Sequence, residues 1–163
     1  MRKHWVVLLG LGILLLVNYG IYKKEQLLTQ GRAVLLELAP VDPRSLMQGD
    51  YMALNFAVAS AAQADMQAAS ASNGHLVLAL DERGIGHFVR IDDGTALGDN
   101  EVRMEYRQRG RLVKFATNAF FFQEGKAKLY EAAKYGEFRV GANGESVLVA
   151  MRDEDFGTIG ERP

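Results

Sequence analysis

The chain has 163 residues, of which 48% are hydrophobic and 24% charged, as expected for one globular domain with an appendage and not for a disordered chain. It contains no cysteine, which excludes disulfides, thiolate catalysis and cysteine-based zinc sites but leaves the cellular compartment open. The formal net charge is −1, and because the first 24 residues hold four basic residues and no acid, the remainder is mildly acidic. Phosphate contacts need clustered Lys and Arg, so no nucleic-acid partner is expected.

The run from Trp5 to Tyr22 carries no charge and predicts a membrane anchor. As a helix it spans roughly 27 Å, close to the thickness of the bilayer hydrocarbon. Trp5, Tyr19 and Tyr22 stand where interfacial aromatic residues are enriched. A buried core helix and a cleaved signal peptide are the alternatives. The flank NYGIYKKEQ holds no small-x-small cleavage site, which favours an uncleaved signal anchor that contacts the membrane through Trp5 to Tyr22.

The orientation of this anchor is less strongly encoded, because Arg2 and Lys3 on one side balance Lys23 and Lys24 on the other. An N-in arrangement is favoured, since the start resembles a signal sequence and we expect no second span. In a Gram-negative cell the protein is then single-pass in the bacterial inner (cytoplasmic) membrane, with its C-terminal domain periplasmic. Residues 1–30 form the signal anchor and its stalk in this interpretation, and residues 31–163 form a β-rich extracytoplasmic domain.

The first half of the outer domain mixes strand and helix patterns. Lys23 to Gln30 continues the helix as a polar stalk that Gly31 ends, and Ala33 to Leu38 reads as a strand. A second strand is predicted over Tyr51 to Val58. Ser60 to Ser72, rich in Ala, Gln and Ser, is either a weakly amphipathic helix or a surface insertion, closed by a turn at Asn73-Gly74.

The second half is β-rich. Strands at Leu76 to Leu80 and Phe88 to Ile91 flank the hairpin loop DERGIG. Val102, Met104 and Tyr106 alternate with charged residues, which is the period of a strand with one buried face. Further elements are predicted in chain order: a strand at Leu112 to Ala116, a helix at Lys126 to Lys134 with Leu129, Ala132 and Ala133 on one face, a stop at Gly136, a strand including Phe138 and Val140, a hairpin turn at Asn143-Gly144, and a strand at Ser146 to Met151. The predicted fold class is α+β, a mostly antiparallel β outer domain with one short helix, preceded by a single N-terminal transmembrane helix.

Gly49, Asp50, Tyr51, Leu54 and Phe56 form the pattern GDY-x-x-L-x-F. This stretch and a second one further along the chain resemble the GDYXXLXY family of bacterial membrane-anchored proteins. The first four of these residues match the name-giving positions, while Phe56 stands where the family has Tyr. AFFFQEGKAKLYEAAKYGEFRV, from residue 119 to residue 140, is similar to the family's second signature, with Gln123 where an acid is common. The resemblance covers nearly the whole chain past the anchor. It implies no mechanism, because the family has no established activity, but its members are encoded beside multi-pass membrane proteins, which implies such a partner.

The triplet Gly49-Asp50-Tyr51 has a structural and a functional interpretation. In the structural one, Gly49 supplies an unusual φ, Asp50 caps backbone N–H groups of a turn, and Tyr51 begins a strand with its ring half buried. In the functional one, Asp50 and Tyr51 belong to a polar site for a ligand amine or a partner's backbone.

Catalytic patterns are weak. Leu46-x-x-Gly49-Asp50 resembles the segment that follows the nucleophile of type I signal peptidases, but Val41 stands where those enzymes have the catalytic serine. Only a shared β scaffold remains as an analogy. The three histidines are scattered, and the acidic group Asp92, Asp93, Asp99 and Glu101 lacks the order of a calcium loop, so a solvated hairpin tip is expected and neither a metal nor another cofactor.

The second signature is rich in aromatic and charged residues. Phe120, Phe121 and Phe122 alternate faces in a strand, so both faces need a cover, either core or partner. Arg107, Arg109, Arg111 and Lys114 form a basic stripe, either an ordinary outer face or a contact for anionic lipid head groups. We hypothesise that Phe120 to Tyr135 and the Gly49-Asp50-Tyr51 turn lie next to each other. The candidate interaction or structural residues are Gly49, Asp50, Tyr51, Leu54, Phe56, Phe120, Phe121, Phe122, Glu124, Gly125, Tyr130, Tyr135, Gly136, Glu137 and Arg139.

These observations favour a non-catalytic, membrane-anchored interaction module that is accessory to an integral membrane protein. The alternative is an envelope-acting hydrolase or a ligand-sensing domain on a signal-peptidase-like scaffold. A deep polar pocket that joins Asp50, Tyr51 and Glu124 favours the alternative, whereas a flat apolar patch favours the module.

Overall fold

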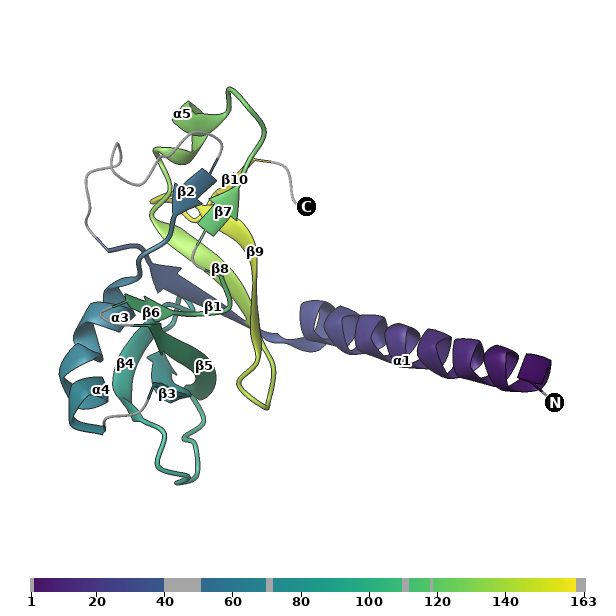
Figure 1. Ribbon diagram of the computed structural model, residues 1–163. Coiled ribbons are helices and arrows are strands. Elements are labelled where there is room, and N and C mark those ends of the chain that lie inside the picture. The colour runs from purple at the N-terminus through teal and green to yellow at the C-terminus, as the bar shows by residue number, and fades with distance from the viewer. Residues whose placement is uncertain (1, 40–50, 70–71, 110–111, 118, 161–163) are drawn as a thin grey trace.

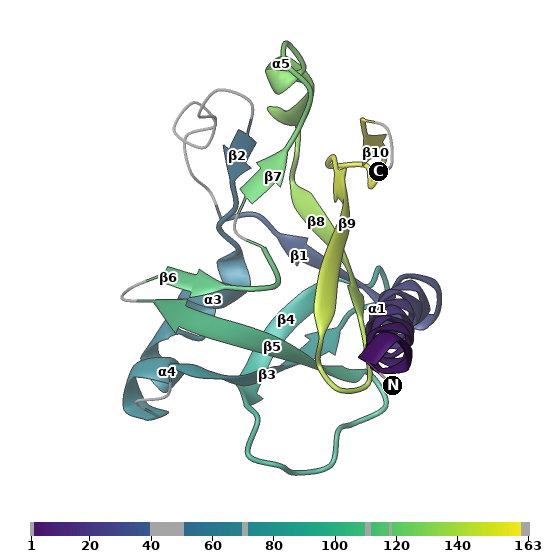
Figure 2. The ribbon, with the colours of Figure 1, turned by 45° about the vertical axis from the view of Figure 1, so that its right-hand side comes forward.

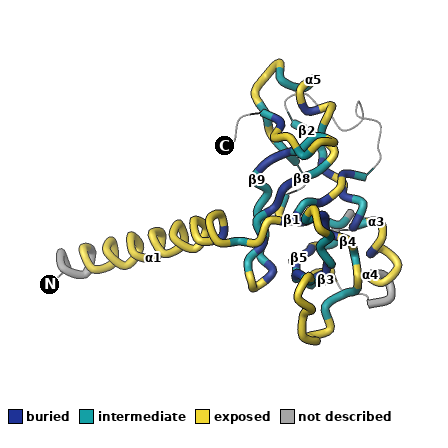
Figure 3. Tube along the Cα trace, turned by 180° about the vertical axis from the view of Figure 1, so that it is seen from behind, coloured by how far each residue is buried: buried dark blue, intermediate teal, exposed yellow. Residues whose placement is uncertain are grey.

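A single long helix projects from a β-rich domain (Figure 1). The computed structural model describes residues 2–39, 51–69, 72–109, 112–117 and 119–160. Helix α1 (Arg2–Gln30) ends before Gly31, as the sequence predicts. Its described part from Val7 to Gln30 has a mean hydropathy of 1.4 and is long and apolar enough to cross a membrane. Figure 3 shows the helix mostly exposed where its burial is described, and Leu27 is its one buried residue between residues 7 and 30.

The described residues of the domain form two four-stranded sheets and a two-stranded ribbon. The first sheet has the order β1 (Arg32–Glu37), β8 (Tyr135–Val140), β9 (Ser146–Arg152), β10 (Thr158–Ile159). The second has the order β4 (Gly86–Ile91), β3 (Asn73–Leu80), β5 (Glu101–Arg109), β6 (Leu112–Lys114). The ribbon pairs β2 (Tyr51–Ala53) with β7 (Ala119–Phe121). All these strand pairs are antiparallel, so the mostly antiparallel α+β class predicted from the sequence is confirmed.

Local sequence patterns account for several of these elements. In β5, Val102, Met104 and Tyr106 are buried and the residues between them are not, as the alternation predicts. The loop between β3 and β4 is closed by Asp81, whose carboxylate accepts hydrogen bonds from the backbone N–H groups of Arg83 and Ile85, both at 2.9 Å. The hydrogen bond from Ile85 is the main cause that lowers the pKa of Asp81 below its usual value.

The core lies where the three sheets meet, around Phe56. The Phe56 ring packs edge-on against Phe138 of β8 at 5.3 Å and Phe115 at 6.1 Å, both measured between ring centroids. The backbone of Phe56 also forms an isolated antiparallel bridge with Leu38, directly after β1. Gly136 lies against the ring, and a Cβ atom at this position would approach the Phe56 ring to 3.0 Å. A glycine is therefore needed where β8 passes Phe56.

The segment after β2 differs from the prediction. We expected one strand from Tyr51 to Val58, but β2 ends at Ala53. Phe56 is the extended residue before α3 (Ala57–Ala61), which is followed by α4 (Gln63–Ala69). The run from residue 57 to residue 69 contains seven alanines, and alanine has the highest helix propensity. Helical structure therefore begins at Ala57, within the segment that we predicted to be a strand. Of the two readings of Ser60 to Ser72, the helix is correct for its described part.

Two further predictions are wrong. Asn73-Gly74 begins β3 instead of forming a turn, because Gly74 lies opposite Tyr106 and a Cβ atom there would approach the tyrosine ring to 3.1 Å. The helix expected over Lys126 to Lys134 is only α5 (Ala127–Tyr130), in which Tyr130 is buried and Leu129 is 52% exposed. With α3 and α4, the described residues thus hold three short helices and not one.

The hydroxyl of Tyr106 yields the first testable prediction. Tyr106 is fully buried, and its hydroxyl has no hydrogen-bond partner among the described residues. Burial also raises the pKa of this hydroxyl. Tyr106→Phe removes an unsatisfied polar group without removing the ring, so we expect the free energy of unfolding to rise by about 1 kcal/mol. Urea unfolding of the full chain in an uncharged detergent measures this.

Met104→Ala is the control, because it deletes a fully buried side chain from the same strand and should lower stability by about 2–5 kcal/mol. A loss of stability in Tyr106→Phe comparable to that of the control would contradict the unsatisfied-hydroxyl account.

Candidate functional site

The β2–β7 ribbon brings the two family-like stretches together. Tyr51 pairs with Phe121, Met52 with Phe120 and Ala53 with Ala119. The hypothesis that the two stretches are neighbours is therefore confirmed for Tyr51. Gly49 and Asp50, with the turn-and-cap interpretation attached to them, lie outside the described residues.

The two faces of this ribbon have different environments. On the inner face Met52 is buried, and Phe120 lies 5.1 Å from Tyr130 between ring centroids. Phe122 stacks on the same Tyr130 ring at 5.1 Å. On the outer face Tyr51 contacts Phe121 with their ring centroids 5.7 Å apart. The two interpretations of the triple phenylalanine thus apply to different residues, since Phe120 and Phe122 pack against the core and Phe121 does not.

Phe121 is the exposed member of this group. Its side chain is 74% exposed, while Tyr51 beside it is half-buried. A strand residue so exposed gains little from folding by itself. The outer face of the ribbon is therefore an aromatic surface that stays exposed in the folded domain. It is formed by β2 and β7, which carry the two family-like stretches.

The remaining motif residues are mainly structural. Leu54 and Phe56 are buried in the core, with Gly136 against the Phe56 ring. Glu124 is exposed, and Gly125 has a φ of +82° in the turn before α5. Neither Tyr51 nor Glu124 lines either of the two grooves described below.

Glu137 and Arg139 belong to an ion-pair network instead of a binding surface. The Glu137 carboxylate, 10% exposed, accepts hydrogen bonds from Arg152 Nε at 2.8 Å and Nη2 at 2.5 Å. Arg139 Nη2 lies 3.7 Å from the same carboxylate. Arg152 also donates to the backbone oxygen of Phe156 at 2.9 Å, and the Phe156 ring stacks on Tyr135 at 5.1 Å between centroids. This network ties the end of β8 to the loop after β9.

Sequence reasoning missed Arg152 and Phe156, which complete the network. Neither lies in a motif, and their partners are defined only by the register of β8 and β9, in which Tyr135 pairs with Arg152. Nothing in the local sequence around Glu137 or Arg152 indicates that the two side chains are in contact.

A groove of about 750 Å³ borders the ribbon and is lined by residues of β7, β9 and the β5–β6 hairpin. Figure 2 labels these strands and shows how they are arranged. Within the described residues, β7 pairs only with β2, so the edge of β7 opposite β2 has no partner strand. The edge of β9 opposite β8 pairs with β10 only at Met151 and Arg152. Ser146, Val147 and Leu148 of β9 and Ala119, Phe120 and Phe121 of β7 line this groove.

The charges of this groove are largely paired. Lys24 of α1 forms an ion pair with Glu145, and this contact is the main cause that lowers the pKa of the Glu145 carboxyl. Arg107 pairs with Glu105 at 3.2 Å. Lys114, half-buried on β6, forms no ion pair with any described carboxylate. Among the described residues that line this groove, Lys114 is therefore the one cation without an ion pair.

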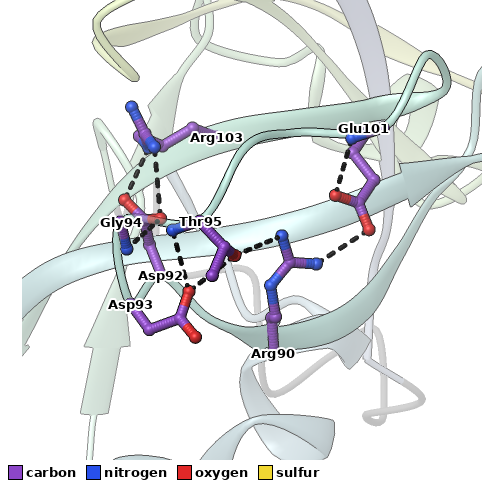
Figure 4. Close-up of polar contacts among 8 residues, drawn as sticks. Arg90, Asp92, Asp93, Gly94, Thr95, Glu101 and Arg103 are labelled. Atoms are coloured by element: carbon purple, nitrogen blue, oxygen red, sulfur yellow. Dashed lines mark hydrogen bonds and ion pairs between the residues drawn. The ribbon is translucent and has the colours of Figure 1, made fainter.

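The acidic group between β4 and β5 is paired more fully than a solvated tip requires (Figure 4). Arg90 Nη1 donates to Glu101 at 2.8 Å, and Arg103 Nε lies 2.5 Å from Asp92. Arg90 is the main cause that lowers the pKa of Glu101, and the Thr95 hydroxyl is the main cause that lowers the pKa of Asp93. Among the residues that the structure describes, no group of three or more His, Asp or Glu side chains is placed to hold a metal ion.

The architecture is that of a β-rich domain carried by one apolar N-terminal helix, with its two sequence signatures joined in one ribbon. The chain belongs to the GDYXXLXY family, whose model matches residues 13–151 under the description "GDYXXLXY protein". The comparison with curated proteins found no match, and neither did the comparison with solved structures.

The Glu137–Arg152 pair gives the second testable prediction. Glu137→Gln leaves the Arg152 guanidinium, 20% exposed, without its charge partner, so the free energy of unfolding should fall by about 3 kcal/mol. Glu105→Gln is the matched control, because it breaks an ion pair with an arginine that is 68% exposed and should cost less than about 1 kcal/mol. Equal small losses in both variants, measured by urea unfolding, would show that the buried pair does not stabilise β8 and β9.

Proposed function

We propose that this protein is a non-catalytic docking module, anchored in the membrane by α1 and accessory to an integral membrane protein. The observation that carries the proposal is the outer face of the β2–β7 ribbon. It holds an aromatic pair, Tyr51 and Phe121, of which Phe121 is 74% exposed beside an open strand edge. Exposed aromatic residues next to a groove are typical of surfaces that bind another protein.

The groove beside this face suits an extended segment of the partner. A strand placed along the open edge of β7 gains backbone hydrogen bonds, and side chains on its two faces gain separate contacts, as in other cases of strand addition. Such a segment also approaches the edge of β9 formed by Ser146 to Leu148. Lys114 supports a segment with a carboxylate, since this half-buried cation has no described ion-pair partner.

The cellular location is part of this proposal. The length and apolar composition of α1 support a single-pass anchor, and we place the N-terminus in the cytoplasm and the β-rich domain in the periplasm of a bacterial cell. A partner in the same inner membrane then presents its segment from its periplasmic side.

The topology is tested by fusing alkaline phosphatase after Pro163, since this enzyme is active only outside the cytoplasm. We expect an active fusion, and we expect the unfused chain to stay in the membrane pellet after carbonate extraction. A cytoplasmic reporter that is active at the same position would reverse the orientation, and release of the chain by carbonate would exclude a transmembrane anchor.

The docking surface is tested with Phe121→Ala, measured by recovery of the partner from detergent-solubilised membranes. A central aromatic residue contributes about 2 kcal/mol or more to an interface, so recovery should fall by at least about ten-fold. The thermal unfolding midpoint should not change, because the side chain is exposed. Leu129→Ala is the matched control, since Leu129 is also a large exposed apolar residue, at 52%, but lies on α5.

Equal recovery with Phe121→Ala and Leu129→Ala would exclude the ribbon as the docking surface. The strand-addition mode has its own readout, namely a benzophenone amino acid placed at position 121 or position 147. We expect both positions to cross-link to one short segment of one protein. Cross-links to two unrelated regions would leave the docking module standing but exclude an extended segment between β7 and β9.

A further inference from the structure

A second groove lies where α1 meets the β-rich domain. It has a volume of about 580 Å³ and is lined by the last turns of α1, the start of β5 and the hairpin between β8 and β9. The residues from α1 that line it include Lys23, Gln26 and Gln30, which follow directly after the uncharged run that ends at Tyr22. If the uncharged run of α1 crosses a bilayer, Lys23 lies at the level of the lipid head groups, and Gln30 lies about 12 Å beyond Tyr22 along the helix.

Most of the charges around this groove are already neutralised. Glu101 is paired with Arg90 and Arg103 with Asp92, as Figure 4 shows. Glu145 is paired with Lys24. These carboxylates have opposite charges close by, so they repel an entering anion less than free carboxylates do.

Two further cations in the lining, Lys23 and Arg32, lie outside these ion pairs, and of the two only Lys23 is close enough to the Glu145 carboxyl to help Lys24 lower its pKa. Neither Lys23 nor Arg32 forms an ion pair with a described carboxylate. Lys23 Nζ lies 5.1 Å from the centre of the Tyr19 ring, which holds it near the membrane end of the groove. Arg32 is exposed, and its guanidinium donates to the backbone oxygen of Glu101 at 3.1 Å and that of Asp99 at 3.4 Å. These bonds fix the cation in place without cancelling its charge.

The rest of the lining is suited to the uncharged part of a lipid. Leu27, Val102 and Val140 give it an apolar floor, and all three are at most 7% exposed. Gln26 and Asn143 add polar side chains at its walls. Two unpaired cations above an apolar floor, at the end of a membrane anchor, match a phosphodiester with its glycerol group.

We propose that this groove binds the phosphate-bearing head group of an anionic phospholipid, with Lys23 and Arg32 as the cations along its lining that attract the negative charge. The proposal rests on the anchoring role of α1 proposed above but not on the docking of a protein partner. A bound lipid fixes the angle at which the β-rich domain stands on the membrane, because the groove is formed by α1 and the domain together.

The test uses the full chain in nanodiscs of phosphatidylcholine with or without phosphatidylglycerol. After release into an uncharged detergent, native mass spectrometry counts the lipids that each variant retains. We expect the protein to retain phosphatidylglycerol in preference to phosphatidylcholine. Lys23→Gln and Arg32→Gln should each reduce retention about five-fold, and the double variant about twenty-five-fold, since one cation near an anionic surface contributes about that factor.

Lys128→Gln is the matched control, because it makes the same change of charge at an exposed residue of α5, away from α1 (Figure 1). Lys23→Gln is the decisive variant, since Lys23 is exposed on a helix and its removal leaves the backbone contacts of Arg32 intact. Equal retention in Lys23→Gln, Arg32→Gln and Lys128→Gln would overturn the proposal.

Two further arms separate the ways in which the proposal can fail. Dihexanoyl phosphatidylglycerol and inorganic phosphate are added separately to the detergent-solubilised chain, and the unfolding temperature is measured. A rise with the lipid but not with phosphate supports a head-group site; an equal rise with both points to a free-anion site and excludes a lipid-specific one. Carbonate extraction tests the anchor independently of the groove. A chain that binds the short lipid but is released by carbonate would support the head-group site and exclude the transmembrane anchor.

Discussion

The burial of Phe56 is the interaction on which the domain depends, because its ring and backbone contact several sheets, which are otherwise joined by few described backbone pairings, among them a bridge between Leu35 and Ile85. Its ring packs against Phe138 in the first sheet and against Phe115, which follows the last strand of the second. Its backbone bridges Leu38 and begins the turn from the ribbon into α3. A buried phenylalanine in such a position contributes several kcal/mol, so loss of this ring affects all three sheets at once.

This constraint explains much of the sequence motif in which Phe56 stands. The described motif residues divide between the inside and the outside of the molecule. Leu54 and Phe56 are buried, whereas Tyr51 lies half-buried on the outer face beside Phe121. The inner residues are explained by packing alone. Packing does not explain Phe121, which contributes little to the core and lies beside an open strand edge. The docking proposal therefore rests on the outer face and not on the motif as a whole.

The elements that sequence reasoning predicted well are those with a strong local pattern. The apolar run of α1, the alternation in β5 and the Asn143-Gly144 hairpin each depend on neighbours in the chain, and each is confirmed. Predictions failed where a distant residue decides. Gly74 was predicted to be a turn residue because its neighbours in the sequence do not indicate that it packs against the ring of Tyr106, 32 positions later. The partner of Glu137 could not be predicted for the same reason, since Arg152 is placed beside it only by the register of two strands.

The two grooves are related through one contact, and this relation links the two proposals. Glu145 lines both grooves, and its ion pair with Lys24 joins the β8–β9 hairpin to the end of α1. Lys23, the preceding residue, lines the groove at the junction, while Lys24 lines the one beside the ribbon. In the two proposals, an anionic head group near Lys23 and a partner segment near Lys24 lie on either side of this ion pair. Exposed ion pairs contribute about 1 kcal/mol or less, so a rearrangement of the contact between Lys24 and Glu145 costs either ligand little.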